Sequence, residues 1–354
     1  MSRMRSQVSQ VEDYPAHLKQ CWQEHLQPKA EGALTVISLF AGCGGSSLGY
    51  SMAGFRELLA VEWDNNAVEI FRHNFPDVPI YCGDIGELAT TELLDRANLQ
   101  MGDLDILDGS PPCQGFSKAK GKRNTDDKRN QLFREYVRIL REIQPKVLIM
   151  ENVTGLVQGK MKIIFAKILR ELKDSGYQVT ARVMNTKYFN VPQARQRVIF
   201  VGTRNDITTK PTHPGPQNKP MKLKAALYDY PQGLSDGEFT GERLNIAKRI
   251  KPHGDGADVI KNHSFGLQRL CWEFPCRTMV AMVGKPHSSF GGGLIHPDEN
   301  RHLNIAEAKR IMSFPDEFDL VGNFQEQWKR LGNSVPPLFM RAIAKHIKAE
   351  SELL

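Results

Sequence analysis

The chain has 354 residues, of which 25% are charged and 40% hydrophobic, so it is long enough for roughly two domains with a substantial buried core. Its 47 basic and 40 acidic residues leave a net charge of +7, which is consistent with a polyanionic partner without identifying one. The sequence lacks both an apolar run of about 18 residues and a secretion signal, and its six cysteines are too sparse for a disulfide framework. We therefore expect a cytoplasmic protein with no membrane association.

The first 33 residues are polar and carry charges of both signs. A short helical pattern runs from Ala16 to Leu26. We predict an N-terminal extension over residues 1–33, either frayed or folded as one docking helix.

From Thr35 onward, apolar strand-like runs alternate with amphipathic helical segments. Strands are predicted at 35–40, 57–62, 79–84, 104–109, 146–150, 178–184 and 197–202. Helices are predicted at 65–75, 131–143 and 160–173. This alternation is typical of βαβ units, so it predicts an α/β fold with a mostly parallel sheet.

Chemically active residue types follow five of these strands. They are Gly42, Glu62, Asp84, Cys113 and Glu151. Because parallel strands end at one edge of a sheet, these residues are expected to share one crevice, where open α/β sheets bind their ligands.

Cys113 follows two prolines, Pro111 and Pro112, at the end of the strand 104–109. The prolines stiffen the backbone, so the thiol emerges from a fixed turn at the expected active edge. Taken alone, this pattern fits either a nucleophile or an inert apolar cysteine in a turn.

The glycine-rich turn that begins at Gly42 resembles a nucleotide-binding loop, and Glu62 lies where a carboxylate can take both ribose hydroxyls of an adenosine. Ser47 occupies the place of the third glycine of the dinucleotide fingerprint. An adenosine without a diphosphate fits better, which favours S-adenosyl-L-methionine over NAD. A plain tight turn is the alternative, and Trp63 either stacks on adenine or belongs to the core.

Further polar groups flank the later strands. Desolvation at the sheet edge would let Glu151 hold a proton near neutral pH, unless it only caps the next helix. Gln193, Arg195 and Arg197 alternate, so on an extended segment they point the same way, and two guanidiniums suit a phosphate or a carbonyl oxygen.

The stretch 118–138 contains eight basic and three acidic residues, which indicates either a solvated face or a lid over a polyanion.

Prolines interrupt the chain between 204 and 222, and residues 223–300 lack regular periodicity, which predicts a domain boundary and a small loop-rich domain. Helical patterns return at 305–314 and 337–350. Cys271 and Cys276, with His253 and His263 upstream, have loose spacing for zinc, so we expect no metal.

Five motifs together resemble the DNA (cytosine-5) methyltransferase family of bacterial or phage type, over Val36 to about Ile347. They stand in the family's order and at similar intervals. They are Phe40-Ala41-Gly42-Cys43-Gly44, Pro111-Pro112-Cys113-Gln114, Glu151-Asn152-Val153, Gln193 to Arg197, and Gly332 to Pro337. The resemblance implies a Rossmann-like S-adenosylmethionine-dependent methyltransferase sheet with a smaller target-recognition domain.

The resemblance also implies a mechanism and a substrate. The Cys113 thiolate would add to carbon 6 of a cytosine flipped out of double-stranded DNA, which activates carbon 5 for methylation. Glu151 would contact ring nitrogen 3, and Arg195 and Arg197 would hold the carbonyl oxygen and nearby phosphates. The enzyme would act as a monomer in a restriction-modification system, with a separate cognate endonuclease, or as an orphan methylase.

The same resemblance assigns the remaining site residues. S-adenosyl-L-methionine would be bound by Phe40, Gly42, Gly44, Glu62, Trp63, Asp84, Ile85, Asn333, Ser334 and Val335. DNA would be bound by Gln114, Ser117, Lys118, Lys120, Gln193, Arg195 and Arg197. The catalytic and cofactor-binding domain would comprise 34–210 plus 326–354, and the target-recognition domain with its hinge would comprise 211–325, where base readout is expected.

The sequence departs from the family pattern near Leu303, where Asn304-Ile305-Ala306-Glu307 replaces the usual Thr-Pro-Arg-Glu. One branch of the family methylates tRNA and carries Cys-Phe-Thr in its recognition region. This chain has Cys271-Trp272-Glu273 and Cys276-Arg277-Thr278 instead, so tRNA methylation is the alternative function rather than the main one.

Overall fold

A computed structural model describes residues 11–112, 128–230, 238–260, 267–283 and 293–351. Its internal contacts divide the chain into two units. Unit 1 comprises residues 1–23, 185–195 and 215–339, and unit 2 comprises residues 24–184, 196–214 and 340–354.

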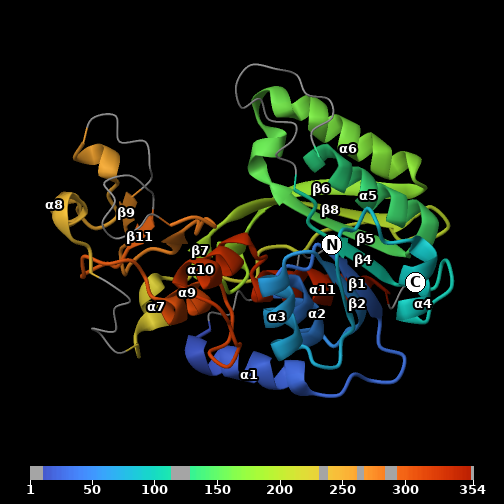
Figure 1. Ribbon diagram of the computed structural model, residues 1–354, viewed down its shortest axis with the longest axis horizontal. Helices are drawn as coiled ribbons and strands as arrows, with labels where there is room; N and C mark the ends of the chain where they lie inside the picture. Colours follow the sequence, from blue (N-terminus) through green and yellow to red (C-terminus); the bar gives the residue numbers. More distant parts are fainter. Residues whose placement is uncertain (1–10, 113–127, 231–237, 261–266, 284–292, 352–354) are drawn as a thin grey trace, which may run out of the picture. The chain divides into compact units, whose positions relative to one another are not determined.

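Seven strands of the described chain form the central sheet, in the spatial order β3-β2-β1-β4-β5-β8-β6 (Figure 1). Their bounds are β1 (Thr35–Leu39), β2 (Arg56–Glu62), β3 (Ile80–Cys82), β4 (Ile106–Gly109), β5 (Val147–Val153), β6 (Tyr177–Asn185) and β8 (Gln196–Arg204). The mostly parallel α/β sheet predicted from the alternating pattern is confirmed.

The first five strands of that sheet run parallel to one another. Strand β1 lies between β2 and β4, with Leu39 opposite Val61 on one side and Gly109 on the other. Strands β3 and β5 extend the parallel pairing outward, and β8 returns antiparallel to β5. The carboxyl ends of β3, β2, β1, β4 and β5 therefore share one edge of the sheet, which we call the carboxyl edge.

Helices cover both faces of this sheet (Figure 1). The helices of the first half of the chain and the last described helix have the following bounds. They are α1 (Tyr14–Leu26), α2 (Gly45–Met52), α3 (Asn65–Asn74), α4 (Thr90–Ala97), α5 (Lys128–Ile143), α6 (Lys162–Asp174) and α11 (Pro337–Ser351). On one face, Leu107, Leu148 and Met150 pack into an apolar core with Leu140 of α5 and Leu172 of α6. This burial is the main source of stability for the unit.

The opposite face carries buried carboxylates as well as apolar side chains. Glu57 of β2 accepts a hydrogen bond from the Ser47 hydroxyl at 2.9 Å, and Asp108 of β4 accepts one from Tyr50 at 3.1 Å. Both hydroxyl donors belong to α2. Burial raises the pKa of Glu57 to about 8 and that of Asp108 to about 7, because removal from water disfavours the charged form.

Unit 1 contains short elements joined by long connections. Their bounds are β7 (Gln193–Ala194), α7 (Leu223–Leu227), α8 (Gly241–Arg249), β9 (Leu267–Arg269), β10 (Cys276–Arg277), β11 (Gly293–Ile295), α9 (Ile305–Ile311) and α10 (Phe324–Asn333). One small apolar cluster of this unit, which includes Phe239, Ile246 and Ile295, lies around β9, β11 and α8. The irregular composition of residues 223–300 therefore corresponds to short strands and helices.

Helices α4, α7, α8 and α10 were not predicted from the sequence. Helix α10 begins with a capping box made by Asn323 and Glu326, and Phe324, Trp328 and Leu331 recur at helical spacing, so its signal was present in the sequence. Helix α4 has only two turns, and it buries Thr90, Leu93 and Ala97. No helix in the described ranges is long and apolar enough to span a membrane.

The buried Glu57 carboxylate makes the stability of the fold dependent on pH. Between its ordinary pKa of 4.5 and its folded value of about 8, the folded chain keeps a proton that the unfolded chain has released. The free energy of unfolding therefore falls as pH rises through this range, by at most about 1.4 kcal/mol per pH unit from this group. Glu57→Gln removes the titration, so the decline should become shallower in urea unfolding curves measured at several pH values.

The Asp108 contribution remains in this variant and ends lower, near pH 7. A decline of unchanged steepness in Glu57→Gln would show that Glu57 is ionised in the folded protein.

Candidate active site at the carboxyl edge

The loop after β1 bends through three left-handed residues. Phe40, Gly42 and Gly44 have φ angles of 59°, 58° and 94°, a region that glycine enters without strain. Gly44 is the N-cap of α2, and an added Cβ there would lie 2.4 Å from Cε2 of Phe75. The chain therefore needs glycine at position 44 both for its backbone angle and for its close packing.

The carboxylate of Glu62 joins this loop to the one that follows β2. Its Oε2 accepts a hydrogen bond from the Gly42 amide at 2.8 Å, and its Oε1 accepts from the amides of Trp63 and Asp64, both at 2.9 Å. The residue is 8% exposed, whereas the neighbouring Trp63 is 76% exposed. An aromatic face in water beside a carboxylate offers a stacking surface next to a hydrogen-bond acceptor.

The other predicted cofactor residues lie in different surroundings. Asp84 follows β3 on the carboxyl edge, and its Oδ1 accepts from the Gly86 amide at 2.9 Å. Ile85 is buried in the apolar core of unit 2, and Phe40 packs against that core. In unit 1, Asn333 ends α10, Ser334 is its C-cap, and Val335 is buried.

The turn before the predicted nucleophile is held by Asn152, which is 4% exposed. Its Nδ2 donates to the carbonyl oxygen of Pro111 at 3.1 Å, and its Oδ1 accepts from the Val153 amide at 2.9 Å. The proline turn is thus fixed to the end of β5. The predicted residues Cys113, Gln114, Ser117, Lys118 and Lys120 lie outside the described residues.

Glu151 and Arg197 form an ion pair at this edge. The Nε of Arg197 lies 2.6 Å from Oε1 of Glu151, and the two side chains are 13% and 12% exposed. The antiparallel pairing of β5 and β8 sets Arg197 opposite Val153 and Glu151 opposite Ile199. The pair places a proton acceptor and a fixed positive charge together in a partly desolvated position, where both interact more strongly than in water.

Gln193 and Arg195 belong to unit 1, because the boundary between the units falls after Arg195. The Gln193 amide nitrogen lies 3.1 Å from the sulfur of Met312, and the side chain is fully buried. Arg195 donates from Nη1 to the carbonyl oxygen of Met279 at 2.9 Å and is 2% exposed. Gln193 and Arg195 therefore each contact a residue of unit 1.

Three polar residues near the site were given no role in the sequence analysis. They are Asp108, Tyr50 and Asn152. Asp108 carried a readable signal, since it is an acidic residue inside an otherwise apolar strand-like run. Tyr50 gave none, because its hydroxyl reaches the sheet only after α2 packs on it.

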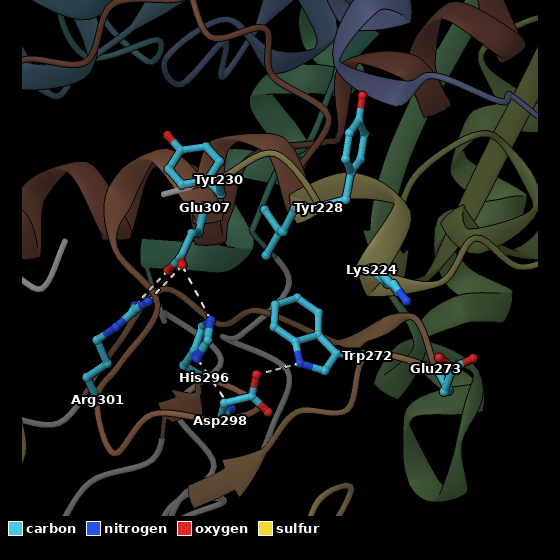
Figure 2. A pocket seen from close by; sticks show the side chains of 10 residues that line it. Lys224, Tyr228, Tyr230, Trp272, Glu273, His296, Asp298, Arg301 and Glu307 are labelled. Atoms are coloured by element: carbon cyan, nitrogen blue, oxygen red, sulfur yellow. Dashed lines mark hydrogen bonds and ion pairs between the residues drawn. The ribbon is translucent and has the colours of Figure 1, made fainter. Parts of the chain in front are cut away.

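A separate cavity of about 350 Å³ lies within unit 1 (Figure 2). Arg301 makes two contacts to the Glu307 carboxylate, at 2.8 and 2.9 Å, and Trp272 donates to Asp298 at 2.8 Å. Burial lowers the pKa of His296 in its wall, so this ring is neutral near pH 7. The Arg301–Glu307 ion pair and the Trp272–Asp298 hydrogen bond thus join separate parts of the irregular segment.

Cys271 and Cys276 lie on the same segment as that cavity. Within the described ranges, no three His, Cys, Asp or Glu side chains gather as metal ligands would.

Comparisons with known proteins cover nearly the whole chain. The sequence profile of the family described as C-5 cytosine-specific DNA methylase matches residues 34–349. The type II methyltransferase M1.HphI of Haemophilus parahaemolyticus is 33% identical over 89% of this chain and 87% of its own length. The type II methyltransferase M.Eco47II of Escherichia coli is 30% identical over 97% of this chain and 85% of its own length.

Solved structures agree with the fold. A chain described as a DNA modification methyltransferase of an Escherichia coli prophage superposes with a TM-score of 0.70 at 25% identity, covering 90% of this chain and all of that one. DNMT2 of Spodoptera frugiperda superposes with a TM-score of 0.65 at 18% identity, covering 89% of this chain and 99% of its own.

The two left-handed glycines of the loop should respond differently to substitution. Gly44→Ala combines a strained backbone with a 2.4 Å contact to Phe75, so we expect a loss of about 3 kcal/mol in the free energy of unfolding. Gly42→Ala meets nothing within 4 Å and should cost only about 1 kcal/mol of backbone strain. Urea unfolding of both variants measures the difference, and equal losses would contradict the packing argument.

Proposed function

The chain belongs to the C-5 cytosine-specific DNA methylase family and is a DNA (cytosine-5) methyltransferase, and we propose that Cys113, Glu151, Arg195 and Arg197 are its catalytic residues. The substrate base is a cytosine flipped out of double-stranded DNA. The methyl donor is S-adenosyl-L-methionine, bound on the carboxyl edge beside the catalytic groups.

The observation that carries this assignment is the hydrogen bond from Asn152 to Pro111. Strands β4 and β5 are neighbours in the sheet, and this bond joins the turn before Cys113 to the residue after Glu151. The turn at Pro111, which precedes Cys113 in the sequence, therefore lies about one strand spacing from the Glu151–Arg197 pair. Reactive groups that follow two neighbouring strands are suited to act on one small planar ring.

The chemistry explains why these residue types are needed. Carbon 5 of cytosine is a poor nucleophile, so the Cys113 thiolate first adds to carbon 6 and makes carbon 5 electron-rich. Glu151 contacts ring nitrogen 3 and the exocyclic amine and stabilises the charge that develops on the ring. After methyl transfer, carbon 5 loses its proton and the bond from Cys113 to carbon 6 breaks.

The arginines neutralise charge that develops on the base. Arg197 is already paired with Glu151, which keeps that carboxylate oriented before the base enters. Arg195 lies in the other unit, where it donates to the Met279 carbonyl. Its assigned role is to hold the base's carbonyl oxygen and nearby phosphates. The base reaches these groups only after leaving the helix, at a cost of a few kcal/mol.

The chain's residues fit S-adenosyl-L-methionine, which supplies the methyl group as an electrophilic sulfonium. Gly42 and Gly44 contribute no side chain to the loop after β1, and Glu62, which accepts from the Gly42 amide, is the proposed acceptor for the ribose hydroxyls. The exposed Trp63 offers a stacking face for adenine, and Asp84 follows the next strand of the edge. Phe40, Ile85, Asn333, Ser334 and Val335 complete the proposed set.

DNA recognition is assigned to residues 211–325, with 34–210 plus 326–354 as the catalytic domain. Gln114, Ser117, Lys118, Lys120 and Gln193 are the proposed DNA contacts beside the two arginines. The similar type II methyltransferases support a place in a restriction-modification system, with an endonuclease as a separate chain. We propose that the enzyme acts as a monomer.

Expression of the chain in a host that lacks cytosine methylation should leave 5-methylcytosine at one short DNA sequence, detected by bisulfite sequencing. Cys113→Ser should reduce methylation by on the order of a thousandfold or more, because a hydroxyl is a far weaker nucleophile than a thiolate. S-adenosyl-L-methionine binding should persist in this variant. Cys21→Ser, which changes a thiol of helix α1 outside every proposed site, is the matched control and should leave methylation unchanged.

If the host DNA stays unmethylated and the protein transfers labelled methyl groups to tRNA in vitro, tRNA methylation replaces DNA methylation as the function. Normal methylation by Cys113→Ser would remove Cys113 from the mechanism.

Glu62→Gln tests the ribose contact directly. The amide keeps the shape of the side chain but loses its charge, so the dissociation constant of S-adenosyl-L-methionine should rise about tenfold, measured by calorimetry without DNA. Glu69→Gln, at an exposed position on the following helix, is the control and should bind normally. Equal affinities of wild type and Glu62→Gln would contradict the ribose assignment.

A further inference from the structure

Val280 and Met282 are exposed apolar side chains in the segment that follows β10. They are 56% and 82% exposed, whereas Met279 and Val283 on either side of them are buried. Met282 is the most exposed large apolar side chain in the part of the chain that the structure describes. Apolar surface in water is unfavourable, and two such side chains at alternate positions of one segment indicate a surface that a partner covers.

This segment, residues 278–282, is fixed on one side to the stretch that contains Arg195. The hydroxyl of Thr278 donates to the carbonyl oxygen of Ala194 at 2.9 Å, and Nη1 of Arg195 donates to the carbonyl oxygen of Met279 at 2.9 Å. The preceding strand, β10, pairs with β7. Because Arg195 is one of the proposed contacts to the target base and its phosphates, the segment lies beside the proposed DNA contacts of unit 1.

Helix α10 fixes the same segment through its backbone. The Nε1 of Trp328 donates to the carbonyl oxygen of Val280 at 2.9 Å. A Cβ added at Gly332 would lie 2.6 Å from Cα of Ala281, so the helix and the segment are in close backbone contact. The two exposed side chains therefore stand on a backbone that is ordered before a partner arrives, which lowers the entropy cost of binding.

Double-stranded DNA is the partner that the family indicates, and its major groove offers one strongly apolar group. The base-pair edges there present hydrogen-bond donors and acceptors, together with the C5-methyl group of thymine. Neither Val280 nor Met282 carries a strong donor or acceptor. Val280 is short and β-branched, so the pair forms a shallow apolar surface, which suits a methyl group better than a gap between stacked bases.

We propose that Val280 and Met282 read the C5-methyl group of a thymine in the recognition sequence of the enzyme. This inference rests on the proposed function, in which residues 211–325 recognise DNA. Burial of the methyl group against the two side chains favours an A·T pair over a G·C pair at that position. The recognition sequence therefore contains thymine.

Deoxyuridine in place of thymine removes only this methyl group from the DNA. Once bisulfite sequencing has given the recognition sequence, kcat/KM of methyl transfer is measured on duplexes in which each thymine of the site is replaced in turn. The wild-type enzyme should lose about three- to fivefold in kcat/KM at one of these positions, as expected for one buried methyl group.

The double variant Val280→Ser/Met282→Gln removes the apolar surface. Its kcat/KM on thymine DNA should fall about three- to fivefold, and it should no longer distinguish thymine from deoxyuridine. Both side chains are exposed, so its thermal unfolding should match that of the wild type. Met101→Gln is the matched control, because Met101 is 66% exposed and precedes β4 on the amino side of that strand. This control should keep the wild-type preference for thymine.

A recognition sequence made only of G·C pairs would overturn the inference, as would a wild type that treats thymine and deoxyuridine alike at every position. A double variant that keeps the wild-type preference would also overturn it, since the two side chains would then contact another part of the DNA. If the double variant does not fold, Met282→Gln alone decides, and its preference for thymine should be weaker than that of the wild type. Failure of the proposed function is recognised separately, because the wild type then methylates neither kind of DNA.

Discussion

The parallel register of β3, β2, β1, β4 and β5 is the constraint on which the proposed site depends. Because these strands point the same way, the segments that follow them meet at the carboxyl edge, although they are widely separated in sequence. The hydrogen bonds between the segments then set the local geometry. Glu62 binds three amides from two loops, and Asn152 binds the carbonyl of Pro111. Glu62 of β2 thereby holds the loop after β1, and Asn152 of β5 holds the turn after β4, so these two described segments of the edge have a fixed geometry.

The two faces of the sheet serve different purposes. The face toward α5 and α6 is apolar and supplies stability through burial. The face toward α2 holds Glu57 and Asp108, whose raised pKa values show that burial is unfavourable for their charged forms. Hydrogen bonds from the hydroxyl groups of Ser47 and Tyr50 in α2 offset part of this desolvation cost. Two buried carboxylates with raised pKa values on one face of a sheet carry a desolvation cost, and proteins concentrate such costs at functional sites.

Unit 1 combines buried apolar side chains with buried arginines that join its loops. Arg269, 6% exposed, donates to five backbone carbonyl oxygens and to Asn300, and Arg301 is paired with Glu299 and Glu307. A planar guanidinium with five donors can satisfy many loop carbonyls at once. Loops held in this way can vary in sequence between their anchors, which suits a segment proposed to read different DNA sequences.

The sequence by itself determined the α/β class, the strand ends that meet at one edge, and the family, because hydrophobic periodicity and motif order depend on local spacing. It did not reveal that the alternating Gln193, Arg195 and Arg197 have separate internal partners, or that Asn152 fixes the proline turn. Nor did it reveal that Tyr50 reaches Asp108. These relations depend on which side chains meet after strands and helices pack, at sequence separations of 41 for Asn152 and Pro111 and 58 for Tyr50 and Asp108. Only the tertiary structure decides them, since a hydrogen bond forms by distance in space.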